Sequence, residues 1–194
     1  MRSPDRGFSL IELIVVVALI ATVVAVALPS FSAFQDRMRL GQTARVVERA
    51  IQQARQKAIN SKRAMRVRFN CPGPGQYRVV ELLGRPSAPA SVDDGLSRCN
   101  QGLYPFPASD SDPATLPNLD GPTQQLDEST RFGAVMTLEF WPDGSVHAPP
   151  GVSPWPLLPT TGRPLTITQT RGATVRTATI TVNGIGRIKL EPVR

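Results

Sequence analysis

Histidines and phosphate-binding glycine loops are what this 194-residue chain most clearly lacks. Its single histidine, His147, excludes a metal site built from several histidines, and no nucleophile-elbow motif accompanies it to suggest a catalytic triad. The Gly73-x-Gly75 turn lacks the third glycine of a dinucleotide-binding loop, and no Gly-Lys-Ser/Thr sequence follows a glycine-rich turn. We therefore expect no enzyme activity, no cofactor and no metal site.

Aromatic residues and cysteines are also scarce, at 6% of the chain and two residues respectively, whereas there are 19 prolines and 15 glycines. This balance predicts a loop-rich domain with short strands. The length allows one globular domain and an appendage. The formal net charge of +7 predicts attraction to polyanions such as nucleic acid or anionic lipid, but it does not select one of them.

One apolar run stands out, at residues 8–28, where all positions except Ser9, Glu12 and Thr22 are apolar. A helix of this length crosses the roughly 30 Å hydrocarbon core of a bilayer. Residues 1–7 carry more basic than acidic side chains and residues 30–34 carry no basic ones, so the positive-inside rule predicts a cytoplasmic N-terminus and an exported, periplasmic C-terminal domain. The alternative is a cleaved secretory signal. Residues 27–29 (Ala-Leu-Pro) give it little support, because they match an A-x-A-like cleavage site poorly.

Glu12 is the anomaly within the apolar run. An acidic side chain in a membrane span costs about 2.5 to 3.5 kcal/mol on insertion scales, so its presence needs a compensating interaction. One explanation is that Glu12 lies near the helix end and snorkels to the interface. The other is that a positive charge of another molecule meets it within the apolar environment.

The residues Gly7-Phe8-Ser9-Leu10-Ile11-Glu12 stand behind a short basic leader and begin the apolar run, and they resemble the processing motif of type IV prepilins and prepseudopilins. The resemblance implies that a prepilin peptidase cleaves between Gly7 and Phe8 and that Phe8 becomes N-methylated. It also implies that Glu12 is the fifth mature residue and meets the N-terminal amine of a neighbouring subunit. Residues 1–7 are then a leader peptide, and residues 8–28 are a transmembrane and filament-core helix of a single-pass inner-membrane protein.

A second helical pattern follows the apolar run. Small or apolar residues at i, i+3/i+4 spacing predict an amphipathic continuation of the helix over residues 29–62, with a stripe suited to covering a sheet: Leu40, Ala44, Val47, Ile51, Ala54 and Ala58.

Alternation with a period of two then predicts strands. Residues 65–69 and 77–82 form an expected hairpin, and further strands are expected at 137–141, from 146, and at 165–169, 174–182 and 187–190. Between them, residues of about 84–130 are rich in Pro, Asp, Ser and Gly, which predicts an extended surface loop. Cys71 and Cys99 are either free thiols or a disulfide, and an exported, oxidising compartment favours the disulfide.

Two segments, Phe140-Trp141-Pro142-Asp143-Gly144 and Gly184-Ile185-Gly186-Arg187-Ile188, resemble the GspH/FimT family of minor pseudopilins and minor pilins. The resemblance implies an α+β fold, a pilin-like lollipop in which a long N-terminal helix packs on two antiparallel sheets, with residues 63–194 as the β-rich periplasmic domain. It also implies a place at or near a filament tip, with other (pseudo)pilins and an inner-membrane assembly platform as partners.

Two functions follow from these resemblances. The first is a structural one, a minor pseudopilin that initiates or caps the pseudopilus of a type II secretion system. The second is a minor type IV pilin that binds DNA, because Gly186-Arg187-Ile188-Lys189 resembles the Gly-Arg-x-Arg motif of DNA-binding FimT-like pilins. Lys189 keeps the charge of the last arginine of that motif but lacks its bidentate fork.

Overall fold

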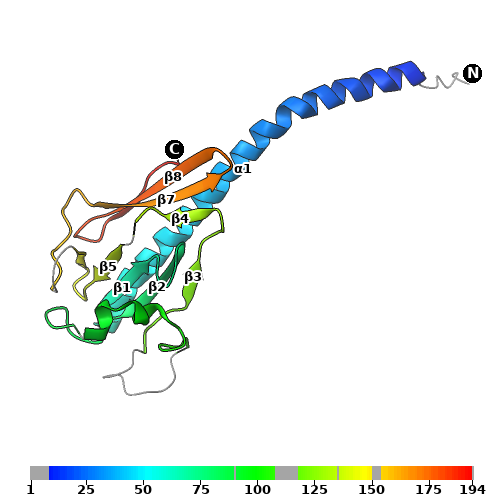
Figure 1. The fold of residues 1–194 in the computed structure, drawn as a ribbon. Helices are drawn as coiled ribbons and strands as arrows, with labels where there is room; N and C mark the ends of the chain where they lie inside the picture. Colours follow the sequence, from blue (N-terminus) through cyan, green and yellow to red (C-terminus); the bar gives the residue numbers. More distant parts are fainter. Residues whose placement is uncertain (1–8, 90, 108–117, 135, 150–153, 194) are drawn as a thin grey trace, which may run out of the picture. The chain divides into compact units, whose positions relative to one another are not determined.

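The structure is a computed structural model that describes residues 9–89, 91–107, 118–134, 136–149 and 154–193, with the backbone alone at 28–30, 91 and 96. The chain divides into two compact units, Met1–Arg39 and Leu40–Arg194. Helix α1, Leu10–Ser61, runs through both units, and the described strands all belong to the second (Figure 1). One long N-terminal helix with two antiparallel sheets confirms the expected α+β fold.

The first unit holds the apolar half of α1. Every side chain from Leu10 to Ala27 is exposed there, because nothing in the described part of the chain packs against it. The helix ends in the second unit at Ser61, whose hydroxyl donates a hydrogen bond to the Lys57 carbonyl at 2.7 Å. Lys62 follows with a φ of 54°, the left-handed conformation in which helices commonly terminate.

The core of the second unit forms around the amphipathic part of α1. The expected stripe is confirmed: its six residues are at most 1% exposed, and they are Leu40, Ala44, Val47, Ile51, Ala54 and Ala58. They belong to one apolar cluster with residues from the inner faces of both sheets, among them Val67, Leu138 and Ile180. Because one helix face serves two sheets, the position of each sheet depends on α1.

The first sheet has five strands in the order β3-β2-β1-β5-β6, with every neighbouring pair antiparallel. Its strands are β1 (Met65–Phe69), β2 (Gln76–Glu81), β3 (Thr123–Gln125), β5 (Thr137–Phe140) and β6 (Val146–His147). β1 and β2 form the expected hairpin, in which Val67 lies opposite Val79. The strand expected from residue 146 is β6, in which His147 is buried.

The second sheet has four antiparallel strands in the order β4-β7-β8-β9. They are β4 (Thr130–Phe132), β7 (Arg163–Arg171), β8 (Thr174–Val182) and β9 (Ile188–Leu190). The long β7–β8 hairpin turns at Gly172, and alternate residues such as Leu165 and Ile180 face the core. The edge strand β9 follows β8 after a tight turn that holds Gly184 and Gly186.

The outer face of the first sheet carries buried arginines in place of apolar residues. Arg66, Arg68 and Arg78 alternate with core residues on β1 and β2 and are at most 8% exposed. Residues 91–107, which we call the covering segment, cap them through backbone carbonyls. Arg68 donates to Gly95 O at 2.6 Å, and Arg78 donates to Tyr104 O at 2.6 Å.

A further arginine, Arg98, belongs to the covering segment itself. It is fully buried and donates two hydrogen bonds to the Asp120 carboxylate, at 2.9 and 3.1 Å, while its guanidinium lies over the Tyr104 ring. Burial raises the pKa of the Asp120 carboxyl, and the hydrogen bond and charge of Arg98 oppose this shift. Removing one partner of a buried pair typically costs about 3 to 5 kcal/mol, because the other charge is then left buried without a partner.

Cys71 and Cys99 form a disulfide that joins the loop between β1 and β2 to the covering segment, with their Cα atoms 5.6 Å apart. Closing a loop of 28 residues in the unfolded chain corresponds to a stabilisation of about 3 to 4 kcal/mol.

Residues 84–130 are not a surface loop throughout, contrary to the prediction. They contain two 3₁₀ helices, η1 (Ser91–Asp94) and η2 (Leu96–Cys99), and the strand β3.

Candidate functional site

The predicted processing residues Gly7 and Phe8 lie outside the described residues. Glu12 is described, in the first turn of α1, where its side chain is exposed and its negative charge suits the helix N-terminus. Within the described part of the chain, α1 is the one helix long and apolar enough to cross a membrane, a test that a signal sequence also passes. The neighbours of Glu12 along this stretch, such as Leu10 and Leu13, are apolar and exposed.

The two segments that carry the family resemblance fold into tight turns in the second unit. In the first turn, Gly144 N donates to Trp141 O at 2.9 Å, and Gly144 has a φ of 85°. In the second, Gly186 N donates to Asn183 O at 2.9 Å, and Gly186 has a φ of 78°. Both turns need glycine at these positions because other residues adopt positive φ only at a cost.

Arg55 of α1 joins the two turns. Its Nε donates to the Gly144 carbonyl at 3.2 Å, and one terminal nitrogen donates to the Ile185 carbonyl at 3.3 Å. A Cβ added at Gly186 would overlap the Arg55 side chain, so the absence of a side chain at Gly186 is what admits the guanidinium. We call this arrangement the Arg55 junction, defined by Arg55, Gly144 and Gly186.

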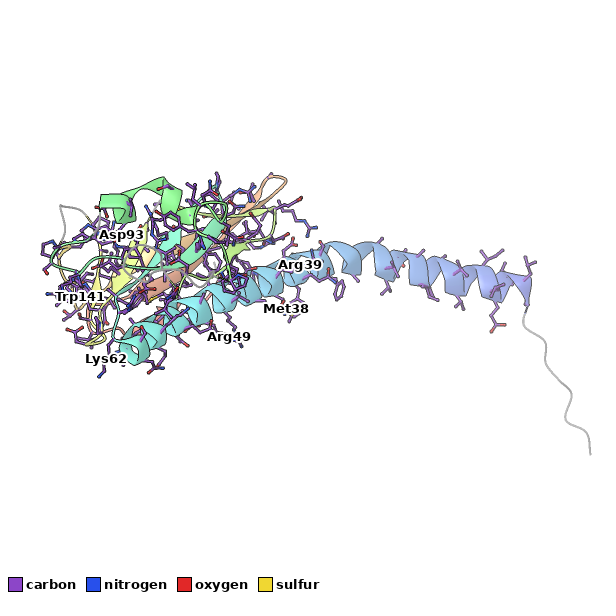
Figure 2. The ribbon with its side chains drawn as sticks, turned by 90° about the horizontal axis from the view of Figure 1, so that it is seen from below. Met38, Arg39, Arg49, Lys62, Asp93 and Trp141 are labelled. Carbon is purple, nitrogen blue, oxygen red and sulfur yellow. A yellow bond between two sulfur atoms is a disulfide. The ribbon has the colours of Figure 1, made fainter. Side chains whose placement is uncertain are left out.

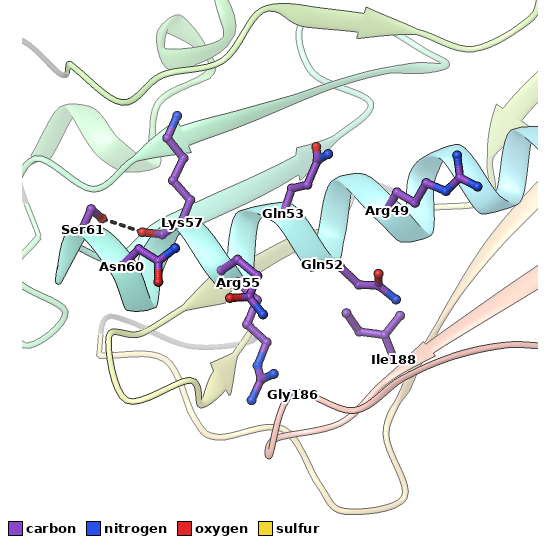
Figure 3. Close-up of a pocket in the computed structure, with 10 residues that line it drawn as sticks. Arg49, Gln52, Gln53, Arg55, Lys57, Asn60, Ser61, Gly186 and Ile188 are labelled. Carbon is purple, nitrogen blue, oxygen red and sulfur yellow. Dashed lines mark hydrogen bonds between the residues drawn. The ribbon is translucent and has the colours of Figure 1, made fainter.

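A polar groove of about 910 Å³ lies beside the Arg55 junction, between α1 and the β8–β9 turn. Figure 3 shows Gln52 and Arg55 reaching from α1 toward Ile188 and Gly186, while Gln53 and Lys57 project from another side of the helix. Arg49 also lines the groove and projects into solvent (Figure 2). The lining includes arginines and a lysine and no aspartate or glutamate, so the groove is electropositive.

Arg187 and Lys189 do not line this groove. Both are exposed. Lys189 lies in β9, where alternation puts it on the opposite face from Ile188, and Arg187 comes immediately before this strand. Lys189 lies opposite Thr181 of β8, on a sheet face where threonines alternate with core residues. No aromatic residue occurs between positions 163 and 190, so this face offers no base-stacking platform.

The structure brings Asp143, Ser145 and His147 together without forming a catalytic triad. The Ser145 hydroxyl donates to Asp143 at 2.6 Å and lies 3.0 Å from His147 Nε2, whereas His147 Nδ1 faces the Trp155 carbonyl. The aspartate therefore contacts the serine and does not orient the histidine. Hydrogen bonds from the Ser145 hydroxyl and amide lower the pKa of Asp143, as expected for a carboxylate that caps a turn.

Sequence reasoning missed Arg55 and the groove beside it. Arg55 stands among other charged and polar residues on the solvent side of α1, where the usual meaning of arginine is solvation. A signal was present in the paired glycines at 144 and 186, because closely placed glycines often mark the approach of another group. Their common partner, however, lies 89 residues from the first of them in sequence.

Two family models match parts of this chain. The model of the prokaryotic N-terminal methylation motif matches residues 2–28, and the model of type II transport protein GspH matches residues 43–186, which include both glycine turns. Among solved structures, the minor pseudopilin EpsH from the Type 2 Secretion System of Vibrio cholerae is similar at 11% identity. The match covers 79% of this chain and 97% of that one, with a TM-score of 0.42. No curated protein is similar enough to count as a match.

We expect Gly186→Ala to destabilise the chain more than Gly172→Ala. Gly186 and Gly172 both have positive φ, at 78° and 57°, so both substitutions carry a backbone cost. That cost is about 1 to 2 kcal/mol. At Gly172 a Cβ meets nothing within 4 Å, whereas at Gly186 it displaces the end of the Arg55 side chain, which then loses its hydrogen bonds to the two turns. Urea unfolding of the detergent-solubilised chain, followed by near-ultraviolet circular dichroism, measures the difference.

An Arg55→Ala background provides the control. There the excess cost of Gly186→Ala over Gly172→Ala should largely disappear, because the overlapping atoms are gone. Equal costs for the two glycine substitutions in the parent chain, or an excess that persists without Arg55, would contradict the Arg55 junction.

Proposed function

Because this chain belongs to the GspH family of type II transport proteins, we propose that it is a minor pseudopilin, a structural subunit of a type II secretion pseudopilus. The observation that carries the proposal is the order of the two matches. An N-terminal methylation motif ends at residue 28, and the GspH match begins at residue 43 of the same helix, α1. The proposed role is assembly rather than catalysis, at the tip or in the initiation of the filament.

The N-terminal segment then works as follows. A prepilin peptidase removes residues 1–7 by cleavage between Gly7 and Phe8, and Phe8 is N-methylated. Residues 8–28 hold the chain in the inner membrane as a single span, with the N-terminus cytoplasmic and the C-terminal domain periplasmic. The arginines at positions 2 and 6 and the exposed apolar surface of α1 support this orientation and this anchoring.

Glu12 supplies the assembly contact in this proposal. A carboxylate within an apolar span is costly, and the cost is offset when a positive charge such as the N-terminal amine of a neighbouring subunit meets it. Partners are therefore other pseudopilins, together with the inner-membrane assembly platform. The exposure of Glu12 on the first turn of α1 leaves it accessible to such a neighbour.

We expect Glu12→Ala to leave membrane insertion intact and to abolish incorporation into pseudopilus complexes, because the apolar run remains while its charge pair is lost. Co-purification with the other pseudopilins measures incorporation, and membrane fractionation measures insertion. Glu48→Ala is the matched control, since Glu48 is an acid on the same helix outside the apolar run. Normal incorporation of the Glu12→Ala chain would sink the assembly role.

A DNA-binding minor type IV pilin is the second candidate. Its specific support is that Arg187 and Lys189 are both exposed, at the start of β9 and within it, and that Lys189 lies opposite Thr181, whose hydroxyl adds a hydrogen-bond donor. Arginine, lysine and threonine side chains are common phosphate contacts in protein–DNA complexes. Without aromatic residues nearby, duplex DNA is the expected ligand rather than a single strand.

Under this second candidate, duplex DNA binds the detergent-solubilised chain with an affinity that falls as salt rises, because phosphate contacts release counterions. The double variant Arg187→Ala/Lys189→Ala should weaken binding and flatten the salt dependence. Lys62→Ala/Arg85→Ala removes the same charge elsewhere on the domain and serves as the control. Fluorescence anisotropy reads out both, and similar losses in the two double variants would reject a site at Arg187 and Lys189.

A further inference from the structure

The edge strand β9 has a free side. The hydrogen bonds from Asn183 N to Arg187 O, at 3.1 Å, and from Glu191 N to Thr179 O, at 2.8 Å, fix the phase of its pairing with β8. Because hydrogen-bonded and non-hydrogen-bonded pairs alternate in an antiparallel ladder, Lys189 is hydrogen-bonded to β8 while Ile188 and Leu190 are not. The N–H and C=O groups of these two residues therefore point away from β8, and they have no backbone partner among the described residues.

The free side of β9 borders the electropositive groove. Ile188 and Gly186 form one wall of the groove, and α1 forms the other with Arg49, Gln52 and Arg55. Arg55 is engaged in the Arg55 junction, and Gln52 donates to Glu48. Arg49 is exposed and has no hydrogen-bond or ion-pair partner in the described part of the chain, so its donors are available to a ligand.

From this juxtaposition we propose that the groove binds an extended acidic peptide segment of another protein. The peptide backbone adds as a strand to the free edge of β9 at Ile188, and a carboxylate of the peptide pairs with Arg49. An unpaired strand edge is a template for a further strand, with main-chain hydrogen bonds giving affinity and flanking side chains giving specificity. An arginine beside that edge, with no acid in the lining, selects negative side chains.

Three features favour a peptide over nucleic acid. The groove volume of about 910 Å³ is in the range of pockets that hold small ligands and suits a short extended chain. The lining has no aromatic residue on which a base could stack. Ladder-competent N–H and C=O groups, as at Ile188, match a peptide backbone and have no counterpart along a phosphodiester chain.

The proposal does not rest on the filament role, because it uses neither Glu12 nor any other part of the first unit. It also differs from the DNA hypothesis in its residues, since Arg187 and Lys189 lie outside the groove. Failure of the peptide site would leave both functions above untouched.

The test uses the full chain in detergent micelles and a fluorescein-labelled decapeptide of alternating threonine and glutamate at low ionic strength. Fluorescence anisotropy should detect binding, and Arg49→Glu should weaken it by about tenfold or more, which is about 1.4 kcal/mol. Arg45→Glu is the matched control, because Arg45 is an exposed arginine one turn earlier on α1 and does not line the groove. It should change the affinity by no more than about twofold, as expected for an exposed charge outside the site.

Two further peptides separate charge from strand pairing. A peptide with lysine in place of glutamate should bind at least about tenfold more weakly, because Arg49 repels it. A peptide of the original charge with N-methyl groups on alternate residues should lose a similar factor, because it lacks the N–H groups that pair with β9. In the complex, hydrogen exchange should slow at the Ile188 and Leu190 amides, which are unpaired in the free chain.

Several results would overturn the proposal. They are no binding of the acidic peptide up to about 1 mM, equal binding of the N-methylated peptide, and equal effects of Arg49→Glu and Arg45→Glu. Arg49-dependent binding of a DNA duplex without binding of the peptide would instead assign the groove to nucleic acid.

Discussion

The buried stripe of α1 is the constraint on which the rest of the structure depends. The inner faces of both sheets share one apolar cluster with residues of this stripe such as Val47 and Ile51, so the helix is common to the cores of both sheets. Short strands and small sheets need such a partner to be stable. The same helix then sends Arg55 outward to the turns at Gly144 and Gly186. The helix that carries the methylation motif thus also organises the domain at its other end.

A second principle operates on the outer face of the five-stranded sheet. Arg66, Arg78 and Arg98 are buried there, which is favourable only when each guanidinium finds carbonyl or carboxylate partners. The covering segment provides carbonyls for Arg66 and Arg78, whereas Glu139 and Asp120 provide carboxylates for Arg66 and Arg98. The Cys71–Cys99 disulfide limits the freedom of the covering segment in the unfolded chain. Polar contacts of this kind are directional, so they fix one placement of the covering segment where apolar packing would allow several.

Sequence patterns predicted the elements whose apolar residues recur regularly. The α1 stripe and the β1–β2 hairpin follow from spacings of 3.6 and 2 residues, and the structure contains both. The covering segment was missed because its buried residues are polar, as with Arg98, and because a 3₁₀ helix of four residues has no readable period. β3 and β4 were also missed, because three residues each are too few for a period.

The candidate sites also differ in how well the sequence alone predicts them. The sequence alone identified Glu12 as a candidate functional residue, because one charge in a long apolar run breaks a strong local pattern. The Arg55 junction and the groove along β9 depend on contacts between distant parts of the chain, which local patterns do not encode. The sequence alone identified Arg187 and Lys189 as charged candidates. It could not predict that they lie outside the groove, because this depends on the register of β9 on β8, which the β8–β9 turn sets.

The central claim is that the apolar segment stays in the mature chain, continues as one helix into the domain and serves in filament assembly. The most direct test is intact-mass and tandem mass spectrometry of the chain purified from membranes. The account predicts a mature chain of residues 8–194 that begins with N-methylated Phe8. An N-terminus at Met1, or one near residues 28–30 as a secretory signal would leave, would contradict it.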